Sequence, residues 1–67
     1  MRNWLIVARM RKGYSQKKMS ELVGISQPSY CAYEKGKTTP RPRHAQKIAK
    51  ILGFSWEEFF KEDTKGA

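Results

Sequence analysis

Apolar residues recur along this chain at the three- and four-residue spacing of amphipathic helices, and no stretch alternates as a strand would. The spacing is clearest where Ala45, Ile48, Ala49 and Leu52 fall on one face of a helix. The pattern predicts an all-α fold, a compact bundle of five short helices. Their expected ranges are, in chain order, 3–12, 16–23, 27–35, 43–52 and 56–61.

The expected helix ends carry residues with suitable capping chemistry. Asn3, Ser15 and Ser26 stand at N-terminal boundaries, where a side-chain oxygen accepts a backbone N–H of the first turn. Ser55 and Glu58 have the spacing of a capping box before the last helix. Glycine tolerates the left-handed conformation that commonly ends a helix, and it follows the first four helices as Gly13, Gly24, Gly36 and Gly53.

One face of each helix is expected to supply the core. The inward residues of the second helix are Met19, Leu22 and Val23, and Ile25 fills the turn that follows. The remaining core candidates are Met1, Leu5 and Ala8 on or beside the first helix, Tyr30 and Tyr33 on the third, and Phe59 on the last.

The helices on either side of Gly24 are joined by a tight turn, which makes residues 15–36 a helix-turn-helix. In DNA-binding versions of this motif, the second helix enters the major groove with its N-terminal residues toward the base edges. Gln27 and Ser29 occupy that first turn, and a Gln amide can pair with adenine N6 and N7. The motif therefore predicts a DNA-reading helix over 27–35.

The charge of the chain favours a polyanionic partner. Its 67 residues carry 14 Lys and Arg against 6 Asp and Glu, a formal net charge of +8. Double-stranded DNA is the partner expected for so basic a small domain. Phosphate contacts are expected at the N-terminus of the second helix, where Gln16 lies, and from polar and basic residues around the third helix. These residues are Lys17, Lys35, Lys37, Thr38, Arg41 and Arg43.

Composition argues against several other classes. Cys31 is the single cysteine, so no internal disulfide is possible, and a reducing cytoplasm is expected, with the protein at the nucleoid when bound to DNA. No apolar run approaches the roughly 20 residues of a membrane span. No catalytic triad, carboxylate pair or glycine-rich phosphate loop is present, so no enzyme is expected. His44 has no second ligand at metal spacing, and we expect no metal, cofactor or small-molecule ligand. A redox role for Cys31, on an exposed helix face, is a minor alternative.

Six short motifs follow one another along the chain: L-I-V-A-R at 5–9, G-Y-S-Q at 13–16, V-G-I-S-Q at 23–27, Y-E-K-G-K at 33–37, P-R-P at 40–42 and I-A-K-I-L-G-F-S-W-E-E-F-F at 48–60. In this order and spacing they resemble the Cro/repressor (xenobiotic-response-element type) helix-turn-helix family of phage and bacterial regulators. The resemblance covers nearly the whole chain, and it implies a lambda-repressor-like DNA-binding domain.

The resemblance also implies roles for single residues. Gln16 would clamp a phosphate and Gln27 would read a base. Arg9 and Glu34 would form an internal salt bridge that fixes the recognition helix against the first helix. The DNA side of that helix would further include Pro28, Ser29, Cys31 and Ala32. Pro28 and Ala32 depart from the polar residues frequent in the family. Specificity is then expected to rest on few direct readers, on DNA shape, or on Arg41 and Arg43 near a minor groove.

Two surfaces compete as the site of self-association. Trp56 and Phe60 lie four residues apart on the last helix and form the favoured dimer patch. Trp4, Val7 and Met10 on the first helix form the alternative.

Residues 1–61 are expected to form the helix-turn-helix DNA-binding domain, and 62–67 a polar, frayed tail. For Tyr30 and Tyr33, core packing is favoured over stacking on bases. The function expected is a dimeric, sequence-specific transcriptional regulator, more a repressor than an activator, that binds a pseudo-palindromic operator through helix 27–35. The alternative is a protein-interaction module of the same fold, either an antitoxin or a factor that bridges to the transcription machinery.

Overall fold

A computed structural model describes the backbone of residues 1–65 and the side chains of residues 1–61. Within that part of the chain the secondary structure is entirely helical, which confirms the all-α prediction. The helices are α1 (Asn3–Arg11), α2 (Gln16–Val23), α3 (Gln27–Lys35), α4 (Pro42–Leu52) and α5 (Glu58–Lys65).

The two helices of the helix-turn-helix have the predicted bounds because their caps form as predicted. The Ser15 hydroxyl oxygen accepts from the backbone N–H of Lys18 at 3.0 Å, and Ser26 does the same for Ser29 at 3.2 Å. Gly24 ends α2 with a φ of 86°, a left-handed conformation that only glycine adopts without strain. The backbone therefore turns sharply between α2 and α3.

Several helix boundaries differ from the predictions. Helix α1 ends at Arg11 rather than at residue 12, and α5 ends at Lys65 rather than at residue 61. Arg2, not Asn3, is the N-cap of α1, and no side chain caps that end. Helix α4 begins at Pro42 rather than at residue 43, since proline suits the first turn of a helix. Residues 56–57 form a turn, so α5 begins at Glu58.

The capping box expected at Ser55 is also wrong. The Ser55 hydroxyl oxygen accepts from the Glu57 N–H at 3.4 Å, and the Glu58 carboxylate accepts instead from Lys61 at 2.9 Å. The reason lies in the backbone: the Glu58 N–H donates to the Ser55 carbonyl at 3.0 Å, which closes a tight turn ahead of the helix.

The core is built mainly from the predicted apolar stripes. All four stripe residues of α4 are buried, which confirms the clearest pattern in the sequence. Two predictions fail in part: Met1 is 78% exposed, and Tyr33 is half-buried. Leu22, Ala8 and Ile25 are half-buried and pack against the core. The buried cluster consists of Leu5, Met19, Val23, Tyr30, Ala45, Ile48, Leu52 and Phe59.

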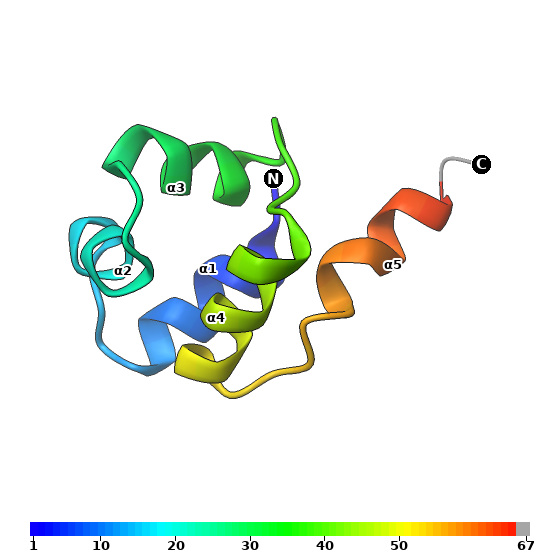
Figure 1. Cartoon of the computed structure of the whole chain (residues 1–67). Coiled ribbons are helices and arrows are strands. Elements are labelled where there is room, and N and C mark those ends of the chain that lie inside the picture. Colours follow the sequence, from blue (N-terminus) through cyan, green and yellow to red (C-terminus); the bar gives the residue numbers. More distant parts are fainter. Residues whose placement is uncertain (66–67) are drawn as a thin grey trace.

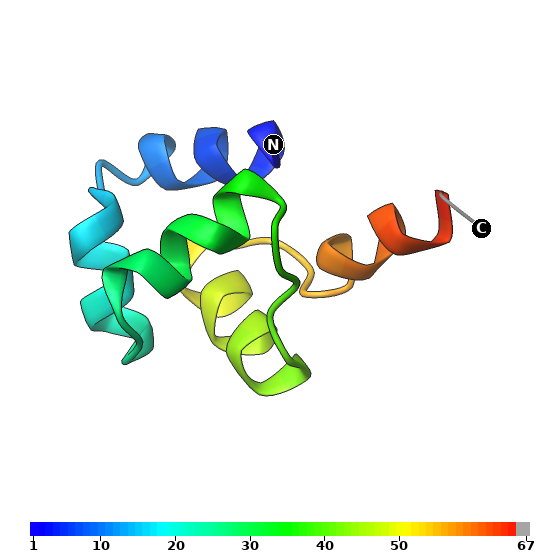
Figure 2. The same cartoon turned by 90° about the horizontal axis from the view of Figure 1, so that it is seen from above.

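Helices α1 to α4 form one body in which α3 packs against α2 and crosses above α1 and α4 (Figure 1). Helix α5 stands to one side of that body in both views (Figures 1 and 2). It is attached at its start, where Phe59 is fully buried. The boundary of a frayed tail over 62–67 stays a prediction: the α5 backbone is helical to Lys65, and residues 66–67 lie outside the described residues. Among the helices described, none is long and apolar enough to cross a membrane.

Candidate nucleic-acid interface

Helix α3 turns one face inward and another face outward. Tyr30 and Glu34, four residues apart, lie on the inward face and are 0% and 1% exposed. Gln27, Pro28 and Ser29 are exposed in the first turn of the helix. Cys31 and Ala32, also predicted on the DNA side, are only half-buried. The structure thus brings all five predicted base-facing positions to the outer and lateral surface of one helix.

A buried carboxylate fixes the orientation of α3. Glu34 Oε2 accepts from Arg9 Nε at 2.6 Å, so the two residues that the resemblance paired are an ion pair in the structure. The Tyr30 hydroxyl donates to the same oxygen at 2.8 Å, and Gln16 Nε2 donates to Glu34 Oε1 at 2.9 Å. One side chain of α3 is therefore bonded to α1, to α2 and to its own preceding turn.

The electrostatics of this cluster favour the ionised carboxylate. Burial opposes ionisation, but the hydrogen bonds from Arg9, Gln16 and Tyr30 outweigh it and lower the pKa of Glu34 below its ordinary value of 4.5. The same bond to Glu34 raises the pKa of Arg9, and burial together with the carboxylate raises the pKa of Tyr30. At neutral pH the cluster is a charged pair whose polar atoms are hydrogen-bonded.

Gln16, the predicted phosphate clamp, has a second role that sequence reasoning did not reveal. Its amide oxygen lies 3.0 Å from the Cys31 sulfur, while its amide nitrogen donates to Glu34. The side chain therefore bridges the start of α2 to the middle of α3. An amide carries two N–H donors, so Gln16 can donate one to a phosphate while the other holds Glu34.

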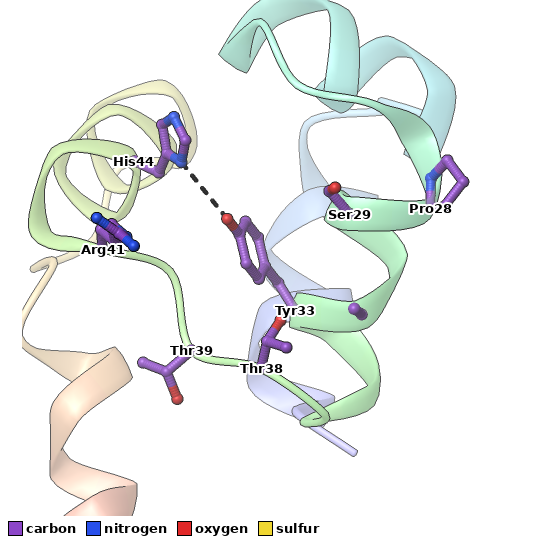
Figure 3. Close-up of a pocket in the computed structure, with 8 residues that line it drawn as sticks. Pro28, Ser29, Tyr33, Thr38, Thr39, Arg41 and His44 are labelled. Atoms are coloured by element: carbon purple, nitrogen blue, oxygen red, sulfur yellow. Dashed lines mark hydrogen bonds between the residues drawn. The ribbon is translucent and has the colours of Figure 1, made fainter.

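A groove of about 490 Å³ runs beside α3 (Figure 3). Tyr33 projects from α3 across the groove, and its hydroxyl lies 3.4 Å from Nδ1 of His44 on α4. This contact explains why Tyr33 is not a full core residue: its ring packs against the core while its hydroxyl reaches the groove. The other lining residues are Pro28, Ser29, Ala32, Thr38, Thr39 and Arg41.

The predicted phosphate-contacting side chains lie on three segments around α3. Lys17 is exposed near the start of α2, and Lys35 is exposed at the end of α3. Residues 35–43 carry further exposed cations and no acidic residue, so every charged side chain of this stretch is positive. Four residues of this stretch belong to the predicted phosphate contacts in addition to Lys35, and all four are exposed: Lys37, Thr38, Arg41 and Arg43.

The two candidate self-association surfaces differ in exposure. Trp56 and Phe60 are half-buried and stack edge to face with ring centroids 5.4 Å apart. Trp4 is engaged elsewhere, since its ring packs against Phe54 and Phe59. Of the alternative patch, Val7 and Met10 remain as exposed apolar side chains, at 45% and 64% exposure.

Several known proteins are similar to this chain. A helix-turn-helix family model matches residues 5–59. The uncharacterized HTH-type transcriptional regulator YqaF of Bacillus subtilis (strain 168) is 34% identical over 62 residues, which are 92% of this chain and 82% of that protein. YgzD, another uncharacterized HTH-type transcriptional regulator of that strain, is 38% identical over 60 residues, or 90% of this chain and 91% of YgzD.

The SPbeta prophage-derived regulator YonR of the same strain is 40% identical over 53 residues. That match covers 79% of this chain but 49% of YonR, so the chain spans about half the length of this relative. No solved structure gives a significant match.

Proposed function

Because the chain belongs to the Cro/repressor-type helix-turn-helix family, whose members are DNA-binding transcriptional regulators rather than enzymes, we propose that it is a dimeric, sequence-specific repressor. It binds a pseudo-palindromic operator in bacterial nucleoid DNA, with α3 in the major groove of each half-site. The likeness to prophage-derived YonR supports a regulator carried by a phage or another mobile element. No cofactor, metal or small-molecule ligand takes part.

The observation that carries this proposal is the division of α3 into a fixed inner face and an exposed outer face. Glu34 and Tyr30 hold the helix through bonds to α1 and within α3. Gln27 and Ser29 remain exposed at the end of the helix that enters the groove. Because the helix is already held in place in the free protein, its backbone need not be ordered on binding, which favours affinity.

Gln27→Ala tests this reading. A Gln amide that pairs with adenine contributes about 1–3 kcal/mol of base discrimination, so the variant should bind the operator about 5- to 150-fold more weakly. Binding to scrambled DNA of the same length should be unchanged. The measurement is fluorescence anisotropy at a fixed salt concentration near 0.15 M, with DNA from the promoter of the protein's own gene.

Gln46→Ala is the matched control, since Gln46 is an exposed glutamine on α4 outside the proposed contact set. It should bind both DNAs as the native protein does. Equal affinity of the native protein for operator and scrambled DNA would contradict sequence-specific binding altogether. Uniform weakening of Gln27→Ala on both DNAs would make Gln27 a backbone contact instead.

The dimer is proposed to form through Trp56 and Phe60. Helix α5 projects from the body of the domain, which leaves room for the same helix of a second copy (Figure 2). Phe60→Glu would place a charge in that interface, and sedimentation equilibrium should then show a monomer. Met10→Glu, at an exposed position on α1, is the control and should remain dimeric.

A monomeric native protein would refute the proposed dimer and favour the second candidate, a protein-interaction module. The exposure of Val7 and Met10 is the observation in favour of that candidate, because it leaves apolar surface on α1 outside the proposed interface. Loss of dimerisation in Met10→Glu, with Phe60→Glu still dimeric, would move the interface to α1.

A further inference from the structure

Arg2 occupies a place in the fold that no motif predicted. We propose that Arg2 is a positioning residue for DNA binding: its buried guanidinium sets the loop of residues 36–41, with its phosphate-contacting side chains, against the end of α3. The inference rests on the proposed function for the role of the loop, and on the structure alone for the contacts.

The hydrogen bonds described for Arg2 converge on the end of α3 and on the loop that follows it. Nη1 donates to the Tyr33 carbonyl at 2.5 Å and to the Thr38 carbonyl at 2.7 Å. Nη2 donates to the Thr39 hydroxyl oxygen at 2.8 Å. The backbone N–H of Arg2 donates to the Glu34 carbonyl at 2.7 Å, which joins the start of α1 to the end of α3.

The guanidinium also lies over an aromatic ring of the core. Its central carbon is 5.6 Å from the centroid of Phe59 on α5, within range of a cation–π interaction. Arg2 as a whole is 3% exposed. One buried side chain therefore connects the end of α3, the loop and α5.

A buried cation of this kind needs acceptors in fixed positions, because a charge without them is costly to remove from water. Among the acceptors described, the Tyr33 carbonyl lies at the C-terminal end of α3, where the helix dipole favours positive charge, and the Thr38 carbonyl lies in the loop. Guanidinium is suited to the task since its planar fork presents several N–H donors at once. If the loop moved away from α3, the cation would lose the acceptors in the loop. The position of the loop in this structure is therefore favoured.

The loop determines where several phosphate contacts fall. Lys37 lies at its start and Arg41 at its end, where Arg41 is the N-cap of α4. Both side chains are exposed and both belong to the predicted phosphate set. A loop held in one position presents these charges in register with α3, whereas a loose loop must be ordered at each binding event.

Limited trypsin digestion tests the positioning without DNA. The Lys37–Thr38 bond lies in the loop, and the Lys17–Lys18 bond lies in α2. In Arg2→Met the end of α3 and the loop lose the hydrogen bonds that the guanidinium donates to them. The initial cleavage rate at Lys37–Thr38 should then rise about tenfold or more, with less than a twofold rise at Lys17–Lys18. Mass spectrometry of the first fragments gives both rates from one digestion.

Arg11→Met is the matched control, because Arg11 is an exposed arginine at the end of α1. In this variant the cleavage rates at Lys37–Thr38 and at Lys17–Lys18 should both be unchanged. A parallel rise at both bonds in Arg2→Met would show that Arg2 only stabilises the whole domain, and unchanged rates would show no positioning; either result overturns the proposal. Arg2→Lys keeps the charge without the fork, so its loop cleavage should fall between those of the native protein and Arg2→Met. Cleavage equal to that of the native protein would overturn the role of the guanidinium.

The consequence for DNA is measured from the salt dependence of operator binding. For folded Arg2→Met, the slope of log affinity against log salt should decrease in magnitude by about one to two, as the contacts of Lys37 and Arg41 weaken. A domain that is only less stable would keep its slope at temperatures where it is folded. An unchanged slope with a loosened loop would overturn the link to DNA binding. If the native protein shows no operator preference, the proposed function fails, while the digestion still decides whether Arg2 positions the loop.

Discussion

Replacement of Glu34 by glutamine should destabilise the domain more than its small change in shape suggests. Glu34→Gln keeps the volume but removes the charge that faces Arg9, and it exchanges one acceptor oxygen for an N–H donor. Arg9 has a side chain only 14% exposed, so its cation is left without the carboxylate 2.6 Å away. The same oxygens also accept from Tyr30 and Gln16, and at least one of these bonds must break.

The expected cost follows from these contacts. Breaking a buried ion pair by removing one partner costs about 3–5 kcal/mol, and we expect about 3 kcal/mol here. The lower end applies because Arg9 keeps its 2.8 Å bond to the Tyr14 carbonyl and some access to water. A domain of 67 residues has a total stability of about 3–10 kcal/mol, so the variant loses a large part of it. The melting temperature should fall by about 12–24 °C.

Urea unfolding followed by far-UV circular dichroism measures the free energy of unfolding directly. Glu21→Gln is the control, an exposed glutamate on α2 whose replacement should change stability by less than about 0.5 kcal/mol. The double variant Arg9→Met/Glu34→Gln should be more stable than the sum of the single changes by about 1–3 kcal/mol, since it leaves no unpaired charge. A Glu34→Gln protein within about 0.5 kcal/mol of the native one, or additive single changes, would refute the reasoning.

The pH dependence gives a second test of the same carboxylate. The folded pKa of Glu34 lies below its ordinary value of 4.5, so its contribution is complete at neutral pH and down to about that value. As pH falls below 4.5 toward the folded pKa, protonation in the unfolded chain removes this stabilisation. The native protein should lose stability in that range, and the difference between it and Glu34→Gln should shrink. A difference that stays constant from pH 7 to pH 3 would contradict the assignment.

Three further outcomes are expected. Lys37→Ala should weaken binding to operator and to scrambled DNA alike, and it should reduce the magnitude of the slope of log affinity against log salt by about one. Fluorescence anisotropy at several salt concentrations measures this slope. An unchanged slope would show that Lys37 does not contact a phosphate. Gly24→Ala should lower the free energy of unfolding in urea by about 1–2 kcal/mol, because the φ of 86° is strained for alanine even though a new Cβ would meet no atom within 4 Å. An unchanged free energy of unfolding would mean that the turn relaxes. Met19→Ala should cost about 2–5 kcal/mol because Met19 is fully buried, and a cost below about 1 kcal/mol would show that the core collapses around the gap.

The sequence was most informative where structure is local. Ser15, Gly24 and Ser26 act through bonds or dihedral angles within a few residues of themselves, so the bounds of α2 and α3 followed directly. Ser55 shows the limit of such reasoning. Its spacing to Glu58 fits a capping box, but the intervening chain closes a turn through backbone bonds, and a side-chain pattern does not reveal that competition.

The site required information that the sequence does not carry. The hydrogen bonds described for the Arg2 guanidinium reach acceptors 31 to 37 residues away, and the position of Arg2 before a helix looks like that of any exposed cation. Gln16 was correctly located at the start of α2, but its bonds to Glu34 and Cys31 depend on how α2 and α3 cross. Long-range contacts of polar side chains leave no periodic signal, because a single polar residue has no stripe to belong to.

The separation of the two faces of α3 bears on how such a regulator can change its target. Gln27, Pro28 and Ser29 can be exchanged for other side chains at little cost in stability, because surface positions tolerate substitution within about 0.5 kcal/mol. The inward pair, Tyr30 and Glu34, keeps the helix at the same angle through such exchanges. If these residues contact bases as proposed, a few substitutions among them would suffice to change the operator. Ser29 is the most constrained of the three because its hydroxyl oxygen accepts from the Ser26 cap at 2.8 Å. Under the proposed function, the DNA sequence that is recognised can therefore change while the orientation of α3 stays the same.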